Sequence, residues 1–288
     1  MANPSKAGRE NVPGDFFVDS TCINCDACRQ LAPSVFADAG DTSFVRMQPR
    51  SVEEERQATR ALLSCPTGSI GTRHRNHASE VKRDFPLHLD GDAYYCGFNS
   101  PKSYGGNSYF VRHPEGNWLI DSPKYLPSLA ERFAELGGIR YIFLTHRDDV
   151  ADGDRYAKHF GSERFIHREE LDAQPDAEHV IDGMGAVQLF HDFLCIPTPG
   201  HTAGHCCLLY AGRYLFTGDH LDWDRDELRL YASRDYCWDS WSDQTRSMAK
   251  LLEYSFEWVL PGHGQRVQLP AVEMHRQLAA LVKRMQAA

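Results

Sequence analysis

The stretch that decides the fold is CIPTPGHTAGHCCLLYAGRYLFTGDHL, residues 195–221. Its PGHTAG segment predicts a tight, glycine-hinged loop that presents His201 at the end of an apolar run. A second apolar run, 213–217, ends in Gly218-Asp219. Both runs have the length of a strand and stop in a turn, so they bring an imidazole and a carboxylate to one edge of a sheet. Nitrogen and oxygen donors on rigid elements are what a divalent metal ion needs.

Two further apolar runs end in histidine in the same way. The sequences THRDD, 145–149, and PGHG, 261–264, each follow a continuous apolar strand. Four strand-end sites of one kind predict a shared metal site. The ligands expected at these four ends are His146, His201, Asp219 and His263.

In this order and at these distances, the motifs resemble those of the metallo-β-lactamase superfamily, over about residues 85–288. The resemblance implies an αββα sandwich, in which two sheets lie between helices, and the alternation of strand-rich and helical segments fits it. The expected fold class is therefore α+β. The resemblance also implies that Asp219 can bridge two metals and that His263 binds the second of them.

The first motif departs from the usual family pattern, H-x-H-x-D-H. The chain reads HRDDVADG over 146–153, so Asp148 replaces the second histidine and keeps the spacing that lets both side chains point into one site. The usual Asp-His pair is either absent or displaced to Asp152-Gly153, where glycine brings no ligand. Asp149 and Asp152 could instead cap the helix that begins here. Capping is the favoured role of Asp149, whereas Asp152 stays open between capping and metal binding.

The donors differ between the two metal positions. The first would be held by His146, Asp148 and His201, with Asp219 within reach. Two imidazoles and a carboxylate with open positions are typical of non-haem iron oxidation chemistry, whereas three imidazoles are typical of a zinc hydroxide site. The second position has only Asp219, His263 and at most Asp152. It should be weak, completed by water, or empty.

A different cofactor motif lies in the N-terminal unit, 16–70. Its cysteines are Cys22, Cys25, Cys28 and Cys65. A C-x2-C-x2-C run with a remote Cys-Pro suits a polynuclear iron–sulfur cluster. The unit resembles a single-cluster ferredoxin, because Ala32 stands where a two-cluster ferredoxin carries a ligand of its other cluster. The intact central cysteine favours [4Fe–4S]. A structural zinc site or buried free thiols are the alternatives, although zinc usually takes two separated cysteine pairs.

Length and composition set the domain organisation. A chain of 288 residues with 42% hydrophobic and 25% charged residues is long enough for one large and one small globular domain. The expected parts are a disordered tail (1–15), a ferredoxin-like domain (16–70), a polar, basic linker (71–84) and a metallo-β-lactamase-fold domain (85–288).

Charge and cysteine usage narrow the partners and the compartment. The net charge of −9 argues against a general nucleic-acid or anionic-membrane binder. No apolar run approaches membrane-spanning length. Four of the nine cysteines are grouped as a cofactor site requires, which favours the reducing cytosol or an organelle stroma over secretion. The sequence gives no oligomeric state.

The remaining conspicuous residues have simpler interpretations. His205 is expected to pack in the core, and His220 to line the pocket. The aromatic residues Trp223, Tyr236, Trp238 and Trp241 could wall the pocket, but the core is the favoured place, because aromatics in such numbers are most often buried. Arg147, beside the first ligand, is a candidate for a charge that faces the substrate.

The cluster domain bears on function because a hydrolase moves no electrons. The flavodiiron branch of the superfamily is similar in placing a carboxylate at the position of Asp148, and it uses two irons to reduce small molecules. We therefore predict an oxidoreductase in which a [4Fe–4S] cluster exchanges electrons with a mono- or dinuclear non-haem iron site. Asp219, Asp148 and Arg147 would take part in catalysis. The partners would be a small-molecule substrate and an external electron donor or acceptor.

Two alternatives stay open. In the first, the chain is a metal-dependent hydrolase, with zinc as the alternative metal, that acts on an ester, thioester, lactone or phosphodiester. The metal would generate hydroxide, Asp219 would orient it, and the cluster would be structural or a sensor. In the second, Gly153 marks a degenerate metal site, and the chain is a cluster-bearing binding protein.

Overall fold

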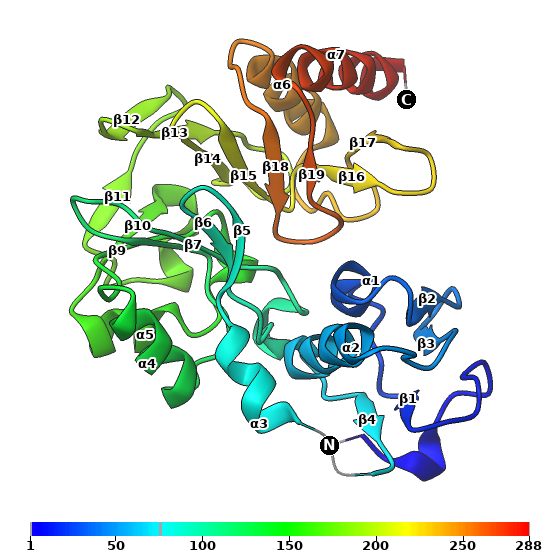
Figure 1. Cartoon of the computed structure of the whole chain (residues 1–288). Helices are drawn as coiled ribbons and strands as arrows, with labels where there is room; N and C mark the ends of the chain where they lie inside the picture. Colours follow the sequence, from blue (N-terminus) through cyan, green and yellow to red (C-terminus); the bar gives the residue numbers. More distant parts are fainter. Residues whose placement is uncertain (1, 75–76, 288) are drawn as a thin grey trace. The chain divides into compact units, whose positions relative to one another are not determined.

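The computed structural model describes residues 2–74 and 77–287. The chain divides into two compact units (Figure 1). The first consists of the residues up to Asn117 together with Ser122–Gly138, and the second of Trp118–Asp121 together with the residues from Ile139 onward. This division differs from the boundary expected at residue 85, because 85–117 groups with the cysteine-rich region.

The N-terminal part of the first unit is a small α/β module. Its elements are β1 (Phe16–Val18), α1 (Ala27–Leu31), β2 (Phe36–Asp38), β3 (Ser43–Val45), α2 (Val52–Ser64) and β4 (Ile70–Thr72). β1 pairs antiparallel with β4, and β2 with β3. The α2 helix begins where the Ser51 side chain accepts a hydrogen bond from Glu54 N, with three glutamates in its first turn. A small apolar core that includes Phe16, Val35 and Ala61 holds these elements together.

Residues 2–15, expected as a disordered tail, are held against this module. The short helix η1 (Pro4–Lys6) lies within this segment. Asn11 Nδ2 donates to Val18 O at 2.8 Å, and Asn11 Oδ1 accepts from Val18 N and Val45 N. A side chain that satisfies three backbone groups of two strands ties this segment to the module.

The segment expected as a linker, 71–84, also contains structure. It begins within β4 and includes α3 (Ala78–Val81) and η2 (Lys82–Asp84). Asp84 accepts hydrogen bonds from Arg56 and Arg60 of α2. Residues 75 and 76 lie outside the described part of the chain.

The rest of the first unit is a strand meander with one helix. Its elements are β5 (Leu87–Asp90), β6 (Ala93–Tyr95), η3 (Pro101–Ser103), β7 (Tyr109–Val111) and α4 (Pro127–Glu135). β5, β6 and β7 pair antiparallel in that order. The α4 helix packs on the meander through Phe133, whose ring centroid lies 5.0 Å from that of Phe110.

The second unit contains two groups of strands. In the first group, β8 (Trp118–Ile120), β9 (Tyr141–Phe143), β10 (Glu163–His167) and β11 (His179–Ile181) pair in parallel. The second is a six-stranded sheet of β12 (Val187–Phe190), β13 (Phe193–Pro197), β14 (Cys206–Tyr210), β15 (Tyr214–Gly218), β18 (Trp258–Pro261) and β19 (Val267–Gln268). Its neighbours are antiparallel except β15 and β18, which are parallel. A hairpin of β16 (Asp222–Asp224) and β17 (Arg229–Tyr231) follows β15.

Aromatic side chains join the two groups of strands. Trp118, fully buried on β8, stacks on Phe193 of β13 at 4.2 Å between ring centroids and on Phe165 of β10 at 5.4 Å. Aromatic stacking of this kind adds to the free energy gained by removing large apolar surfaces from water. The two strand groups therefore form a sandwich with a continuous core.

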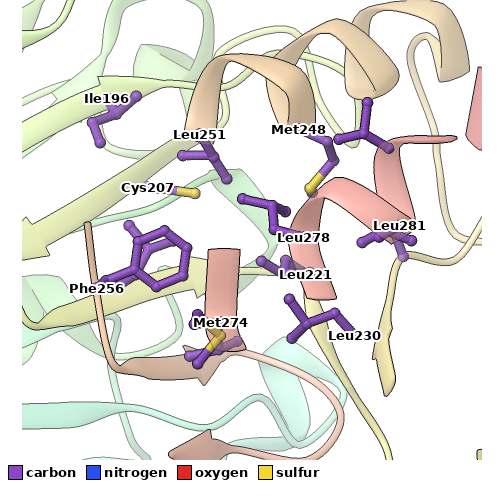
Figure 2. Close-up of a cluster of buried hydrophobic side chains, with 14 of the residues drawn as sticks. Ile196, Cys207, Leu221, Leu230, Met248, Leu251, Phe256, Met274, Leu278 and Leu281 are labelled. Carbon is purple, nitrogen blue, oxygen red and sulfur yellow. The ribbon is translucent and has the colours of Figure 1, made fainter. Parts of the chain in front are cut away.

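Helices flank these strands. α5 (Gly153–Phe160) connects β9 to β10, and η5 (Arg168–Ala173) connects β10 to β11. α6 (Trp241–Leu251) and α7 (Ala271–Ala287) cover the six-stranded sheet, and Figure 2 shows their buried side chains in one cluster with those of the strands. Among the described residues, none of the helices has the length and apolar character needed to cross a membrane. The second unit is thus a two-sheet sandwich with helices, as expected.

Candidate metal centre

The strand ends of the second unit deliver the predicted ligands. His146 follows β9, and the helical turn η4 (Arg147–Asp149) comes directly after it. His201 lies in the loop between β13 and β14. Gly218 of β15 pairs with Pro261 of β18, so Asp219 and His263 leave neighbouring parallel strands at the same edge. The predicted convergence of these four residues is present.

Asp219 lies between the two imidazoles of the first position. Its Oδ2 is 3.6 Å from His146 Nε2 and 3.7 Å from His201 Nε2. These distances are too long for hydrogen bonds. Ligands that each lie about 2.1 Å from one ion are about 3–3.5 Å apart at tetrahedral or octahedral angles. Both distances from Asp219 Oδ2 to the imidazole nitrogens are therefore only slightly longer than those between two ligands of one ion.

Asp148 completes this position. Its Oδ2 is 3.9 Å from His146 Nε2 and 3.7 Å from His201 Nε2, and the three residues form a group whose donor atoms all lie within 4.8 Å of one another. The neighbouring His201 holds the pKa of Asp148 below its usual value. The Asp148 side chain is 44% exposed while both imidazoles are buried, so this is the side from which solvent reaches the donors.

Asp149 faces the same site, which corrects the expectation that it caps a helix. With His146 and Asp219 it forms a second group of donors within 4.8 Å. Within the described residues, neither of its carboxylate oxygens has a hydrogen-bond partner, although the residue is 1% exposed. Burial, with the charge of Asp219, raises the pKa of Asp149 to about 6. A buried carboxylate without donors is unfavourable unless a cation neutralises it.

A backbone turn places Asp149 at the site. It lies three residues after His146, and the 3-10 turn η4 that follows the histidine brings the chain back toward it. Asp152 occupies the N-cap position of α5, where its side chain makes no capping hydrogen bond. It is in neither of the two donor groups found among the described residues, and its role as a metal ligand stays a prediction.

The last motif brings the two carboxylates and His263 together. His263 Nδ1 lies 2.8 Å from Asp219 Oδ1. A Cβ atom at Gly262 would lie 2.5 Å from Asp149 Oδ2 and 2.6 Å from Asp219 Oδ1, so any larger residue would displace these carboxylates. This close approach explains the first glycine of PGHG.

The charges of the site fit a bound cation. Burial alone lowers the pKa of His146, but the neighbouring Asp219 raises it to about 10. Burial raises the pKa of Asp219, yet His263 and His146 hold it well below its usual range. The carboxylates thus favour positive charge on the imidazoles, and a metal ion would supply that charge in place of protons, since binding at imidazole and carboxylate donors releases protons.

A buried hydrogen-bond chain orients His146. Thr145 Oγ1 donates to Asp121 at 2.9 Å and lies 3.0 Å from His146 Nδ1. Because the hydroxyl has one proton and gives it to Asp121, it can only accept from His146 Nδ1–H. This leaves the lone pair of Nε2 directed at the site, an arrangement common for histidine ligands of metals.

We expect Thr145→Val to weaken metal binding by about 10–100-fold, because valine keeps the shape of threonine but cannot orient the imidazole. The dissociation constant would be measured by competition with a chelator. Thr245→Val, which removes a threonine hydroxyl that donates to Trp241 O within α6, is the control and should bind metal normally. An unchanged affinity in folded Thr145→Val would contradict this role.

Glu170, which the sequence did not identify, connects the two ligand loops. It lies on η5 and is 1% exposed. Its Oε1 accepts from Gly204 N at 2.7 Å, and its Oε2 accepts from Arg147 N at 3.2 Å. One buried carboxylate therefore fixes the backbone next to His146 and the backbone of the His201 loop.

Arg147 itself is directed elsewhere. Its guanidinium forms an ion pair with Asp172, and its Nε lies 4.0 Å from Glu170 Oε2. The side chain expected to face the substrate is thus paired with acidic residues of η5. The contribution of Arg147 that the structure shows is its backbone N–H.

The two other histidines of the region are buried beside the ligands. His205 Nδ1 lies 2.9 Å from Thr198 Oγ1, and the His205 ring stacks on that of His220 at 4.8 Å. Burial lowers the pKa of both histidines, that of His220 to about 3. Both are therefore neutral, and His205 packs in the core as expected.

Two of the aromatic residues expected in the core are exposed. Tyr236 and Trp238 have 64% and 63% of their surface in contact with solvent. Trp238 N donates to His201 O at 2.9 Å, and its ring centroid lies 6.3 Å from that of His201. Trp223 and Trp241 are partly buried against the α6–α7 cluster. Trp238 is thus an exposed aromatic side chain beside His201, with its backbone bonded to that residue.

The four N-terminal cysteines have the surroundings of a cluster site. Ser43 N donates to Cys22 Sγ at 3.4 Å, and Ser69 N donates to Cys65 Sγ at 3.3 Å. Such bonds to ligand sulfurs tune iron–sulfur clusters. Burial raises the pKa of the thiols of Cys25 and Cys28 to about 12, and ligation to a metal would hold them as thiolates.

Comparison with known proteins supports both the iron–sulfur cluster domain and the metallo-β-lactamase fold. Residues 18–72, which contain all four of these cysteines, match the family described as the 4Fe-4S single cluster domain of Ferredoxin I. The zinc and free-thiol alternatives for this motif are therefore not supported. A hydroxyacylglutathione hydrolase from Citrobacter koseri is 38% identical over 82 residues, which are 28% of this chain. The matched stretch spans 32% of that relative's length.

Solved structures resemble the chain over most of its length. The metallo-β-lactamase DIM-1 aligns with a TM-score of 0.53 and 14% identity over 70% of this chain and 96% of its own. The mono-zinc form of the metallo-β-lactamase FIM-1 from Pseudomonas aeruginosa aligns with a TM-score of 0.53 and 17% identity over 70% of this chain and 95% of its own. At such identities the likeness concerns the fold alone.

Proposed function

Because this chain has the metallo-β-lactamase fold and an N-terminal [4Fe–4S] domain of the single-cluster ferredoxin kind, we propose that it is an iron-containing oxidoreductase. In this proposal the cluster exchanges electrons with a mono- or dinuclear non-haem iron site in the second unit. A small molecule is the substrate, and an external protein or small molecule donates or accepts electrons. A reducing compartment, the cytosol or an organelle stroma, suits both iron sites.

The observation that carries the proposal is the donor set. Asp148 stands beside His146 and His201, and Asp149 and Asp219 add two more carboxylates. Oxygen-rich sets with two imidazoles suit iron, whereas three imidazoles suit the zinc hydroxide of metallohydrolases. Iron bound here would supply one-electron chemistry and coordination positions open to a substrate.

The exposure of the residues suggests separate roles for them. His146 and His201 are buried, so they would hold the ion in place. Asp148 is the exposed donor, and the substrate would approach on its side. Trp238, beside His201, would provide an apolar surface for the substrate.

Asp219 would link the two metal positions. One of its oxygens faces the two imidazoles and the other faces His263. With Asp149 and His263 as further donors, a second ion would have ligands even though Gly153 brings none. The proposal therefore includes a dinuclear form.

A second candidate is a metal-dependent hydrolase of an ester, thioester, lactone or phosphodiester. The similarity to a hydroxyacylglutathione hydrolase favours it. In that case Asp219 would orient the nucleophile, zinc would be the metal, and the cluster would be structural or a sensor. A third possibility, a cluster-bearing binding protein, requires that the centre hold no metal.

Metal analysis of anaerobically purified full-length protein separates these functions. Iron, zinc and acid-labile sulfide would be measured on the same sample. Iron in excess of the cluster's complement, with reoxidation of the reduced cluster that depends on this extra iron, is the result expected for the oxidoreductase. Stoichiometric zinc with esterase or thioesterase turnover would instead establish the hydrolase. A centre that takes up neither metal would leave the binding protein.

A further inference from the structure

A segment outside the ferredoxin-like region covers one of the cluster cysteines. Gly105 of the segment NSPKSYGGN, 99–107, lies in the first unit, as do the four cysteines. A Cβ atom at Gly105 would lie 2.9 Å from Cys25 Cβ, 3.1 Å from Cys25 Sγ and 2.8 Å from Pro66 Cγ. No side chain fits there, so the backbone itself packs against the cysteine.

Hydrogen bonds fix this segment in place. Gly105 N donates to Ser100 O at 2.8 Å, and Asn99 Nδ2 donates to Gly105 O at 2.6 Å. Tyr95 OH in turn donates to Asn99 Oδ1 at 2.6 Å. Asn99 is 2% exposed, so a buried amide bonds directly to the residue that touches Cys25.

The residue before Gly105 is held in an unfavourable conformation. Tyr104 has φ of +48°, in the left-handed region that bulky residues avoid, and it is 77% exposed. Its exposed ring gains little from packing that would offset this cost. Conformations of this kind persist where the surroundings impose them, often at functional sites. Here the requirement comes from placing the next residue against the cysteine.

The cluster sulfurs have different surroundings. Cys22 and Cys65 accept backbone N–H bonds from Ser43 and Ser69. Cys25 accepts a backbone N–H bond from Ala27 and in addition has Gly105 beside its Sγ. Because solvent exposure of a cluster and hydrogen bonds to its sulfurs set its reduction potential, the cover at each corner matters.

We propose that the segment 99–107 is part of the binding site of the [4Fe–4S] cluster, where it covers Cys25 and limits the access of water and oxygen. Gly105 is a positioning residue in this arrangement, since it makes the close approach possible. The segment controls the lifetime of the cluster in air and its reduction potential. This role is independent of the metal centre and of the reaction performed there.

Two glycine variants of the full-length protein test this role. Gly105 and Gly40 have similar positive φ angles, +87° and +93°, so alanine strains the backbone alike at both. A Cβ at Gly40 meets nothing within 4 Å, whereas at Gly105 it meets Cys25. After anaerobic reconstitution, we would measure the half-life of the visible absorbance in air and the midpoint potential by redox titration followed by electron paramagnetic resonance.

Gly105→Ala is expected to shorten the half-life several-fold and to shift the potential, or to fail to take up a cluster. Gly40→Ala should keep the wild-type values. Wild-type behaviour of Gly105→Ala would overturn the proposal. Equal losses in both variants would also overturn it, because backbone strain alone would then explain the effect.

A third variant covers the case in which Gly105→Ala does not fold. Asn99→Asp keeps the size of the side chain and adds no atom beside Cys25, but it removes the N–H group that donates to Gly105 O and so loosens the segment. A half-life shorter than that of the wild type, with unchanged cluster content at the start, is the expected result. A wild-type half-life and potential would count against the segment as a cover.

Discussion

Asp219→Asn should weaken metal binding at the centre of the second unit by about a hundredfold or more. Removing a residue that only orients a ligand costs about 10–100-fold in affinity, and Asp219 is expected to be a ligand itself. One oxygen of Asp219 faces the imidazoles of His146 and His201, and the other lies 2.8 Å from His263 Nδ1. The change removes a negative charge and replaces one carboxylate oxygen with an amide nitrogen, which is not a ligand. The dissociation constant would be measured by chelator competition, with cluster absorbance recorded on the same sample.

The control for this change is Asp182→Asn. Asp182 is exposed and forms an ion pair with Arg168, so its loss removes the same charge from the same unit without touching the centre. The control should bind metal as the wild type does, and both variants should keep the cluster. Wild-type affinity in Asp219→Asn would show that the metal position built around this residue is wrong.

Cys65→Ser should remove the iron–sulfur cluster and leave the metal centre of the second unit intact. It should abolish the visible absorbance and the paramagnetic signal of the cluster, because an alkoxide is a poor substitute for the fourth thiolate. Cys65 lies at the C-terminal end of α2, whereas the other three cysteines of the motif follow β1. It is therefore the one cysteine of the motif that this part of the described chain contributes. Metal bound at the second unit should remain at its wild-type content.

Cys237→Ser is the matched control for this prediction. Cys237 is also partly buried, and its Sγ donates to Gly200 O, a bond that serine can form. The cluster should persist in this variant. If cluster signals survived in Cys65→Ser, the fourth ligand would have to be sought elsewhere. Together, the aspartate and cysteine variants separate the two metal cofactors in one protein.

The parts of the site that the sequence predicted are those encoded by strand ends. His146, His201 and His263 each follow an apolar run, and the ends of neighbouring strands lie close together in a sheet. The cysteine motif was equally predictable, because three thiolates within seven residues have few physical explanations other than a shared cofactor. In both cases the local spacing of residues was sufficient for the prediction.

The parts that it did not predict depend on contacts between distant residues or on backbone turns. Glu170 bonds to residues 23 positions before it and 34 positions after it, a relation that no local pattern contains. Asp149 reaches the site through a 3-10 turn, whereas the pattern of adjacent acidic residues favoured a helix cap. Trp238 was expected in the core because composition carries no information about which aromatic residues a loop exposes.

Glu170 has a consequence for how the centre could be altered. Because this carboxylate holds the two loops by their backbone amides, the positions of the loops do not depend on the chemistry of the ligand side chains. Asp148, half-open to water, is then the position where metal preference can be retuned while the scaffold stays unchanged. A change at this one exposed side chain is therefore expected to alter which metal the centre prefers without moving the two loops.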